Sequence, residues 1–271
     1  MINLKKNEDE LAQAVLSKVN LSKSDDKIKE HVVNLSKCVV NLSKEANVDL
    51  GEVKAQVVVV VDYSGSMSQM YKDGTVQRVI NRLLPLGLTF DDNGEVEVFR
   101  FADGKNYAQF ESLTIENYDD YVKRFIDTGW MGGTDYAPVL KEIKKQYIDG
   151  NTKKAGLFGK LFGKKENTST LTGADASVNP VFVIFITDGD NSDKKDTNVI
   201  IRELSKTNSF IQFIGVGTAS MSYLEKLDDL DGRECDNTGF ERFEDIESVD
   251  DYTLYNKVLM QFADWLKIKG F

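Results

Sequence analysis

Residues that commonly build zinc and redox sites are scarce in this sequence. Its 271 residues include one histidine, His31, and two cysteines, Cys38 and Cys235. A structural zinc site takes four Cys or His ligands, and a disulfide framework takes more cysteines than these, so both are excluded. We expect both thiols to be packing residues, and His31 to be a surface or packing residue and not a metal ligand.

Basic residues are outnumbered by acidic ones, and long apolar runs are absent. Lysine and arginine total 34 against 44 aspartates and glutamates, a net charge of −10 that repels a phosphate backbone, so no nucleic acid is expected as a partner. The longest apolar runs, Val57–Val61 and Val181–Ile186, fall far short of a membrane span. The N-terminus lacks the apolar segment of a signal peptide. We therefore expect a cytoplasmic protein, and a monomer.

From residue 52 onward, short apolar runs alternate with amphipathic segments, which is typical of an α/β fold with a mostly parallel sheet. The predicted strands are Ala55–Val61, Glu95–Phe101, Tyr107–Leu113 at an edge, Val181–Ile186 and Phe210–Val216. The predicted helices are Val76–Leu84, Tyr118–Asp127, Pro138–Ile148, Thr197–Ser205, one from Ser222, and Thr253–Ile268. We predict a doubly wound sheet of about six strands with helices on both faces.

The first 50 residues differ from the rest and predict a helical leader before a domain at 51–271. VNLSK occurs at 19, 33 and 40. Apolar residues spaced four and three apart form one stripe on a predicted helix over 25–46, and Asn7 with Glu10 predicts the start of a shorter helix. The stripe is Ile28, Val32, Leu35, Val39, Leu42 and Ala46. We expect this helix to dock on its own domain, because fewer than three heptads make a marginal coiled coil; pairing between chains is the alternative.

Residues 150–179 interrupt the α/β pattern and predict an insertion. We expect a surface loop whose apolar residues tuck against the domain. The alternative is a basic, aromatic patch over 153–165 that contacts a partner or a membrane surface. The residues of this patch are Leu157, Phe158, Lys160, Leu161, Phe162 and Lys164.

Oxygen-bearing side chains follow the first buried strand, in VVVVVDYSGSMSQ (57–69). Asp62 comes directly after the valines, and Gly65 lets the chain turn so that Ser64 and Ser66 can face the same point. Ligands of open α/β sheets lie beyond the carboxyl ends of the strands, which is where these three residues are expected.

Two further segments carry matching side chains. The second buried strand leads into Thr187-Asp188-Gly189, so adjacent strands would bring Asp188 opposite Asp62, and Thr134 in Gly132-Gly133-Thr134 adds a hydroxyl. Carboxylates about 4 Å apart repel by about 4 kcal/mol at an effective dielectric constant of 20. Oxygen ligands with few carboxylates fit a hard divalent ion, Mg²⁺ or in its place Mn²⁺.

This pattern resembles the von Willebrand factor A (vWA) domain with its metal-ion-dependent adhesion site (MIDAS). The resemblance implies a Rossmann-like fold and five ligand positions, Asp62, Ser64, Ser66, Thr134 and Asp188, with one aspartate acting partly through water. It also implies a non-catalytic protein whose ion binds a carboxylate of a partner. The segments VVDYSGSM, GWMGGTDYAPVL and FVIFITDGDN are similar to the bacterial tellurium-resistance (Ter-type) branch, which also resembles copine A domains, and this implies a role in tellurite or related stress.

Three other interpretations remain. Asp188, Ser66, Thr134 and Asp135 could each cap a following helix. Asp62 could be the nucleophile of a Mg²⁺-dependent phosphoryl-transfer enzyme, although such enzymes have an aspartate two residues later, where Ser64 stands. The ion could also be purely structural, in a scaffold.

Overall fold

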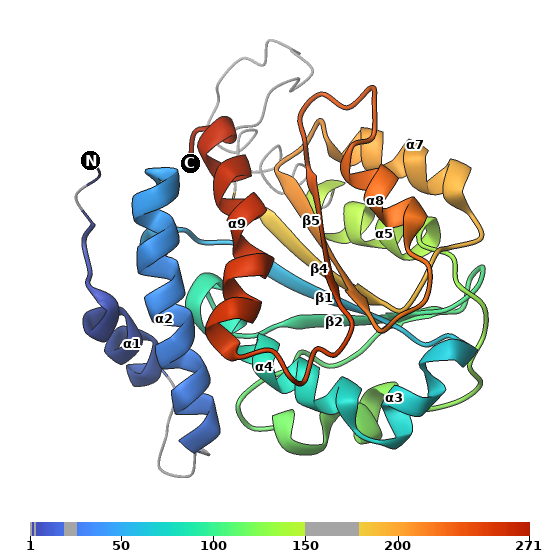
Figure 1. The fold of residues 1–271 in the computed structure, drawn as a ribbon, viewed down its shortest axis with the longest axis horizontal. Coiled ribbons are helices and arrows are strands. Elements are labelled where there is room, and N and C mark those ends of the chain that lie inside the picture. Colours follow the sequence, from blue (N-terminus) through green and yellow to red (C-terminus); the bar gives the residue numbers. More distant parts are fainter. Residues whose placement is uncertain (1, 3, 19–25, 150–178) are drawn as a thin grey trace, which may run out of the picture.

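A six-stranded sheet lies at the centre of the protein (Figure 1). The computed structural model describes residues 2, 4–18, 26–149 and 179–271. The strand order is β3-β2-β1-β4-β5-β6, and within the described residues β3 alone is antiparallel to its neighbour. The strands are β1 (Gln56–Asp62), β2 (Glu97–Phe101), β3 (Tyr107–Gln109), β4 (Val181–Thr187), β5 (Ser209–Val216) and β6 (Thr238–Phe243). The predicted α/β fold is confirmed.

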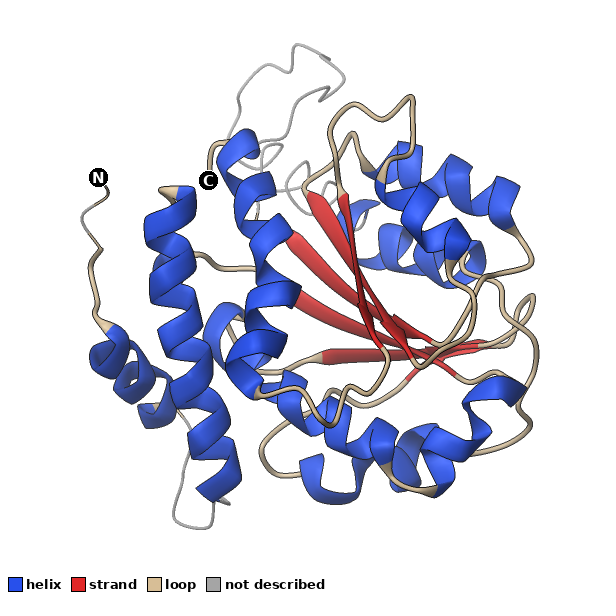
Figure 2. Cartoon of the chain, in the orientation of Figure 1, coloured by secondary structure: helices blue, strands red, loops and turns tan. Residues whose placement is uncertain are grey.

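Helices cover both faces of this sheet (Figure 2). They are α1 (Glu8–Ser17), α2 (Asp26–Ala46), α3 (Ser68–Lys72), α4 (Thr75–Phe90), α5 (Ala137–Ile143), α7 (Lys194–Leu204), α8 (Ser222–Asp228) and α9 (Asp251–Lys269). Short 3₁₀ turns are formed by Leu50–Glu52, Gly65–Met67 and Tyr118–Asp120, and π-helical turns by Val122–Ile126 and Lys144–Asp149.

The two faces of the sheet belong to two separate hydrophobic cores. In β1, Val57, Val59 and Val61 join the core that includes α4 and α9, whereas Val58 and Val60 join the core that includes α5, α7 and α8. Successive side chains of a strand point to opposite faces, so an unbroken valine run is what a strand buried on both faces requires. The sequence pattern therefore placed β1 in the interior of the sheet.

The N-terminal helices add a further layer outside α4 and α9. All six residues of the predicted stripe on α2 are buried in the core that contains α9. Asn7 and Glu10 form the predicted capping box of α1. The long helix thus packs on its own chain, as expected, with α2 alongside α9 (Figure 1).

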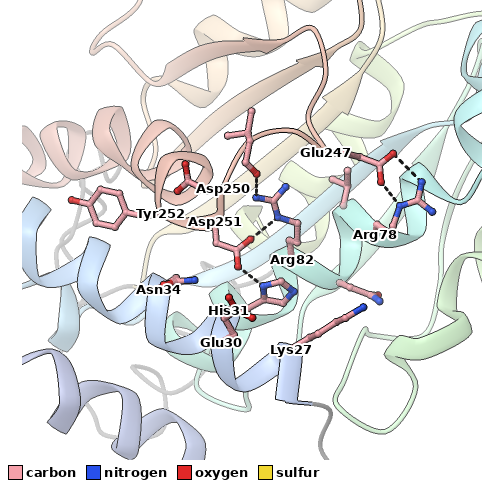
Figure 3. A pocket seen from close by; sticks show the side chains of 13 residues that line it. Lys27, Glu30, His31, Asn34, Arg78, Arg82, Glu247, Asp250, Asp251 and Tyr252 are labelled. Carbon is pink, nitrogen blue, oxygen red and sulfur yellow. Dashed lines mark hydrogen bonds and ion pairs between the residues drawn. The ribbon is translucent and has the colours of Figure 1, made fainter.

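A polar contact joins three helices at the end of this layer. His31 Nδ1 on α2 lies 2.5 Å from Asp251 Oδ2 at the start of α9, and Arg82 Nε on α4 donates to Asp251 Oδ1 at 2.7 Å (Figure 3). Burial opposes the charge of Asp251, but His31 and Arg82 more than offset it, and the pKa of this carboxyl is lowered. A pocket of about 590 Å³ opens beside these residues (Figure 3).

Some boundaries and one strand differ from the sequence analysis. β6 was not predicted, because Thr238–Phe243 is an edge strand whose middle residues are only half-buried and carry mixed polarity. β3 ends four residues before the predicted Leu113. The segments predicted as helices at 118–127 and 144–148 form 3₁₀ and π turns instead.

The described residues bear only in part on the predicted insertion, the membrane prediction and the domain division. Most of the expected insertion, including the patch of Leu157, Phe158, Lys160, Leu161, Phe162 and Lys164, lies outside the described ranges. None of the helices in the described part of the chain is both long and apolar enough for a bilayer crossing. The division into a leader and a domain at residue 51 stays a prediction.

Candidate metal centre

The candidate site lies where β1 and β4 end side by side. These strands pair in parallel, with Val61 opposite Ile186, so Asp62 and Thr187 are the next residues along each strand. The Thr187 hydroxyl donates to Asp62 Oδ2 at 2.6 Å. Asp188 then follows as the first residue beyond β4. As expected, the sheet brings the ends of the two buried strands together.

The loop after β1 brings four of the predicted ligands into one chain of contacts. The Ser64 backbone N–H donates to Asp62 Oδ1 at 2.8 Å, which turns the loop back over the strand end. The Ser64 and Ser66 hydroxyl oxygens lie 3.0 Å apart, and the Ser66 hydroxyl donates to Asp188 Oδ1 at 2.9 Å. Asp62, Ser64, Ser66 and Asp188 thus form one cluster of oxygen atoms.

Thr134 lies in the neighbouring loop, without a hydrogen bond from its side chain to that cluster among the described residues. The Gly65 N–H donates to the Gly132 carbonyl at 3.0 Å, and the Ser192 N–H donates to the Thr134 carbonyl at 2.8 Å. A Cβ on Gly132 would lie 2.3 Å from Asp103 Oδ1, so the exposed Asp103 side chain would have to move to admit a larger residue. The third segment is therefore anchored beside the first two.

Within the described residues, no basic side chain balances the negative charges of this cluster. Burial raises the pKa of Asp62 to about 7, although hydrogen bonds from Thr187 and Ser64 lower it, and the charge of Asp188 raises it further. Burial also raises the pKa of Asp188, against a lowering by Ser66. Neither acid forms an ion pair with any described residue. A bound cation would stabilise both carboxylates in their charged form.

Exposure is graded across the site. Asp62 is 0% exposed and Ser64 and Asp188 are buried, whereas Thr134 is half-buried and Ser66 is exposed.

Among the described residues, no group of three or more His, Cys, Asp or Glu side chains could hold a metal. Two acids with three hydroxyls match the ligand preference of Mg²⁺ or Mn²⁺, which retain waters and need few carboxylates. The residues present fit such an ion.

Helix capping does not account for Thr134 and Asp135. The backbone N–H groups of Tyr136 and Ala137, at the start of α5, donate to the two carboxylate oxygens of Asp193 at 2.9 and 2.8 Å. Asp135 instead accepts from the Gly104 N–H at 2.7 Å. Asp193 therefore caps the helix that Thr134 and Asp135 could have capped.

The structure adds residues that the sequence analysis did not assign to the site. The Tyr136 hydroxyl donates to the Gly189 carbonyl at 2.5 Å and lies 3.2 Å from Thr187 Oγ1. The Tyr71 hydroxyl donates to the Asp62 carbonyl oxygen at 2.8 Å. Thr187 belongs to the Thr-Asp-Gly motif, so its position next to Asp188 could have assigned it to the site. No sequence pattern indicated that Tyr136 and Tyr71 would contact the site.

Comparison with known proteins identifies the family. The chain matches the family model vWA-TerF-like, described as the vWA found in the TerF C terminus, over residues 54–163 and 165–270. It is 32% identical over 239 residues to uncharacterized protein YcbR of Bacillus subtilis (strain 168), covering 87% of this chain and 86% of that protein.

Solved structures of low sequence identity are also similar to this chain. Proximal thread matrix protein 1 from the mussel byssus is 14% identical with a TM-score of 0.46, over 78% of this chain and 47% of its own. The chain thus spans about half the length of the mussel chain, which is also known with a zinc-occupied MIDAS motif. Manganese-loaded TRAP protein of Plasmodium vivax is 14% identical with a TM-score of 0.47, over 78% of this chain and 73% of its own. On the family match and the relative from Bacillus subtilis, this chain belongs to the vWA-TerF-like family of von Willebrand factor A domains.

Proposed function

We propose that this protein is a non-catalytic binding protein that uses a divalent metal ion to hold an acidic group of a partner. One observation carries the proposal. Two buried carboxylates, unpaired with any described basic residue, lie at the ends of two central strands beside two serine hydroxyls that are 3.0 Å apart, and one of these hydroxyls donates to Asp188 at 2.9 Å. The proposed ion is Mg²⁺, with Mn²⁺ as a substitute.

Each side chain has a distinct role in this proposal. Ser64, Ser66 and Thr134 would hold the ion through their hydroxyls, and Asp188 would supply charge from the end of β4. Asp62 is deeper than the others and accepts hydrogen bonds at both carboxylate oxygens, which suits a supporting role partly through water. When bound, the ion supplies a positive centre that can accept a carboxylate oxygen from outside. Ser66 is exposed, so a partner can reach this side of the cluster.

We further propose that the protein acts in bacterial tellurium resistance or a related stress response, in the cytoplasm and as a monomer. The proposed role in this stress response is supported only by the match to the vWA-TerF-like family.

Phosphoryl transfer is the less favoured alternative. An aspartate nucleophile needs an oxygen that can reach a phosphorus atom in line. Asp62 is fully buried, and the Ser64 N–H and the Thr187 hydroxyl occupy its two oxygens. These contacts favour binding over catalysis.

Calorimetry and a metal-dependent pull-down test the proposal together. Titration of Mg²⁺ and of Mn²⁺ into the protein should show one site, which Ser66→Ala weakens and the control Ser68→Ala, two residues later, leaves unchanged. A pull-down from a bacterial host in Mg²⁺ or EDTA should lose the same proteins with Ser66→Ala as with EDTA. Absence of metal uptake would contradict the proposal. Metal uptake that raises stability without any metal-dependent partner would favour a scaffold, and metal-dependent phosphatase turnover abolished by Asp62→Asn would favour an enzyme.

A further inference from the structure

An exposed tryptophan lies two residues from the loop that pairs with the candidate metal centre. Trp130 is 92% exposed, whereas the other tryptophan, Trp265, is 1% exposed. Gly132 forms a parallel bridge with Ser64, and two residues span at most about 7 Å of chain. Trp130 therefore lies close to where a partner would meet the proposed ion.

The chain before Trp130 is held firmly in place. The Arg100 guanidinium donates to the carbonyls of Ile126 and Thr128 at 2.6 and 2.5 Å and stacks on the Tyr63 ring at 4.5 Å from its centroid. The Tyr63 hydroxyl donates to Asp127 Oδ1 at 3.0 Å. Tyr63 stands between Asp62 and Ser64, so the loop that carries Trp130 is joined directly to the metal-binding motif.

The chain after Trp130 is held as well. Met131 packs against the core, the Gly132 N–H donates to the Tyr63 carbonyl at 3.3 Å, and the Asp135 N–H donates to the Ala102 carbonyl at 2.9 Å. Trp130 thus projects from a backbone that is anchored on both sides. A large ring left in water on an ordered loop loses little conformational entropy when a partner covers it, and such tryptophans are frequent anchors of binding interfaces.

An unpaired carboxylate lies on the same rim. The Asp103 side chain is packed against Gly132, as the 2.3 Å approach to a Cβ there shows, and it is exposed. Within the described part of the chain it forms no ion pair, not even with Lys105 in the same turn. A divalent ion would balance the two charges of Asp62 and Asp188. An incoming carboxylate would then still meet the negative charge of Asp103.

We propose that the partner is a protein segment in which a lysine or arginine lies within about four residues of the metal-binding acid. The cation would lie on the face of the Trp130 ring and pair with Asp103, because an aromatic face and a free carboxylate both attract a cation. This inference rests on the proposed function, since the acid of the same segment binds the ion. Trp130 and Asp103 are then the residues that decide which acidic segments bind. An anionic membrane is disfavoured because the rim and the protein as a whole are negative.

Selection from a random heptapeptide display library tests the inference on the full-length protein. The protein is loaded with Mg²⁺, and bound peptides are eluted with EDTA. Wild type should select peptides with an acidic residue and a lysine or arginine within four positions of it. Trp130→Ala and Asp103→Asn should still select the acid and lose the preference for the base. Val199→Ala, which changes an exposed apolar side chain on α7, should select as wild type does.

A selected peptide, made synthetically, then gives affinities and locates the contact. Acrylamide quenching of tryptophan fluorescence should fall when the peptide binds wild type, and Trp130→Phe should show no such change because Trp265 is buried in both states. We expect Trp130→Ala to weaken binding at least tenfold and Asp103→Asn about threefold.

Three results would overturn the inference. Selection of acidic peptides without a basic residue, or an unchanged basic preference in both variants, would refute it while leaving the proposed function intact. Binding to vesicles of phosphatidylserine and phosphatidylcholine that Trp130→Ala abolishes would assign the tryptophan to a membrane instead. Failure to select any EDTA-eluted acidic peptide would refute the proposed function, and the inference with it.

Discussion

The Thr187 hydroxyl offers the sharpest test of how the metal centre is supported. Its side chain is fully buried and donates to Asp62 Oδ2 at 2.6 Å. Thr187→Val keeps the shape of the side chain and removes this donor. A hydrogen bond to a charged acceptor contributes about 1.5–3 kcal/mol. Loss of a group that orients a metal ligand typically weakens metal binding about 10- to 100-fold, which corresponds to about 1.4–2.7 kcal/mol.

We therefore expect Thr187→Val to bind Mg²⁺ and Mn²⁺ about 10- to 100-fold more weakly by isothermal titration calorimetry. Urea unfolding in EDTA should show a loss of about 1–3 kcal/mol in the free energy of unfolding. Thr89→Val is a matched control, because the Thr89 hydroxyl is buried with no hydrogen-bond partner among the described residues and its removal should be neutral or stabilising. A folded Thr187→Val protein with metal affinity within twofold of wild type would refute the role given to the Asp62 carboxylate.

Three further predictions concern other parts of the molecule. Asp251→Asn leaves partly buried Arg82 without its acid and should lower the free energy of unfolding by about 1–3 kcal/mol at pH 7. Because the pKa of Asp251 is lowered in the folded state, this difference in stability should narrow as the pH falls below about 4 in urea titrations, and a difference that stays constant with pH would contradict the assignment. Gly132→Ala should weaken metal binding and lower stability by about 1 kcal/mol, since its Cβ would displace the Asp103 carboxylate and lie 3.1 Å from the Ala102 Cβ, whereas Gly133→Ala, with 3.4 Å to its nearest atom, should change neither quantity. Cys38 is fully buried with its pKa raised by burial to about 12, so thiol reagents should label it only as fast as the protein unfolds; rapid labelling in native buffer would show that α2 opens away from α9.

Much of the fold could be predicted because strong local patterns coincided with buried elements. The valine run of β1 and the apolar run of β4 are buried on both faces, and the stripe on α2 is buried along its whole length. β6 could not be predicted, since an edge strand is covered on one side only and TGFERF has no clear alternation of buried residues. The turns at 118–127 escaped prediction for a related reason. Apolar spacing is similar in an α-helix and in tighter or wider turns, and tertiary contacts select among them.

The candidate site likewise combines residues that the sequence predicted with contacts that only the structure shows. Asp62, Ser64, Ser66 and Asp188 could be chosen from the sequence, because each stands at or just beyond the end of a recognisable buried strand. Their contacts depend on β1 and β4 being neighbours, which the structure shows. The support that Tyr136 and Tyr71 give to the strand ends could not be foreseen. A tyrosine hydroxyl finds its acceptor through the packing of elements far apart in the sequence.

The sequence by itself determined the secondary structure of the central elements, the family, and the residue types gathered at the strand ends. These follow from short-range patterns, which depend on residues only a few positions apart in the sequence. Only the tertiary structure decided that Asp62 is buried beneath the serines, that α2 joins α9 through His31 and Asp251, and that Trp130 remains in water. Burial and pairing of this kind arise from contacts between segments that are far apart in the sequence. The energies of these contacts depend on the folded environment, which local sequence patterns do not describe.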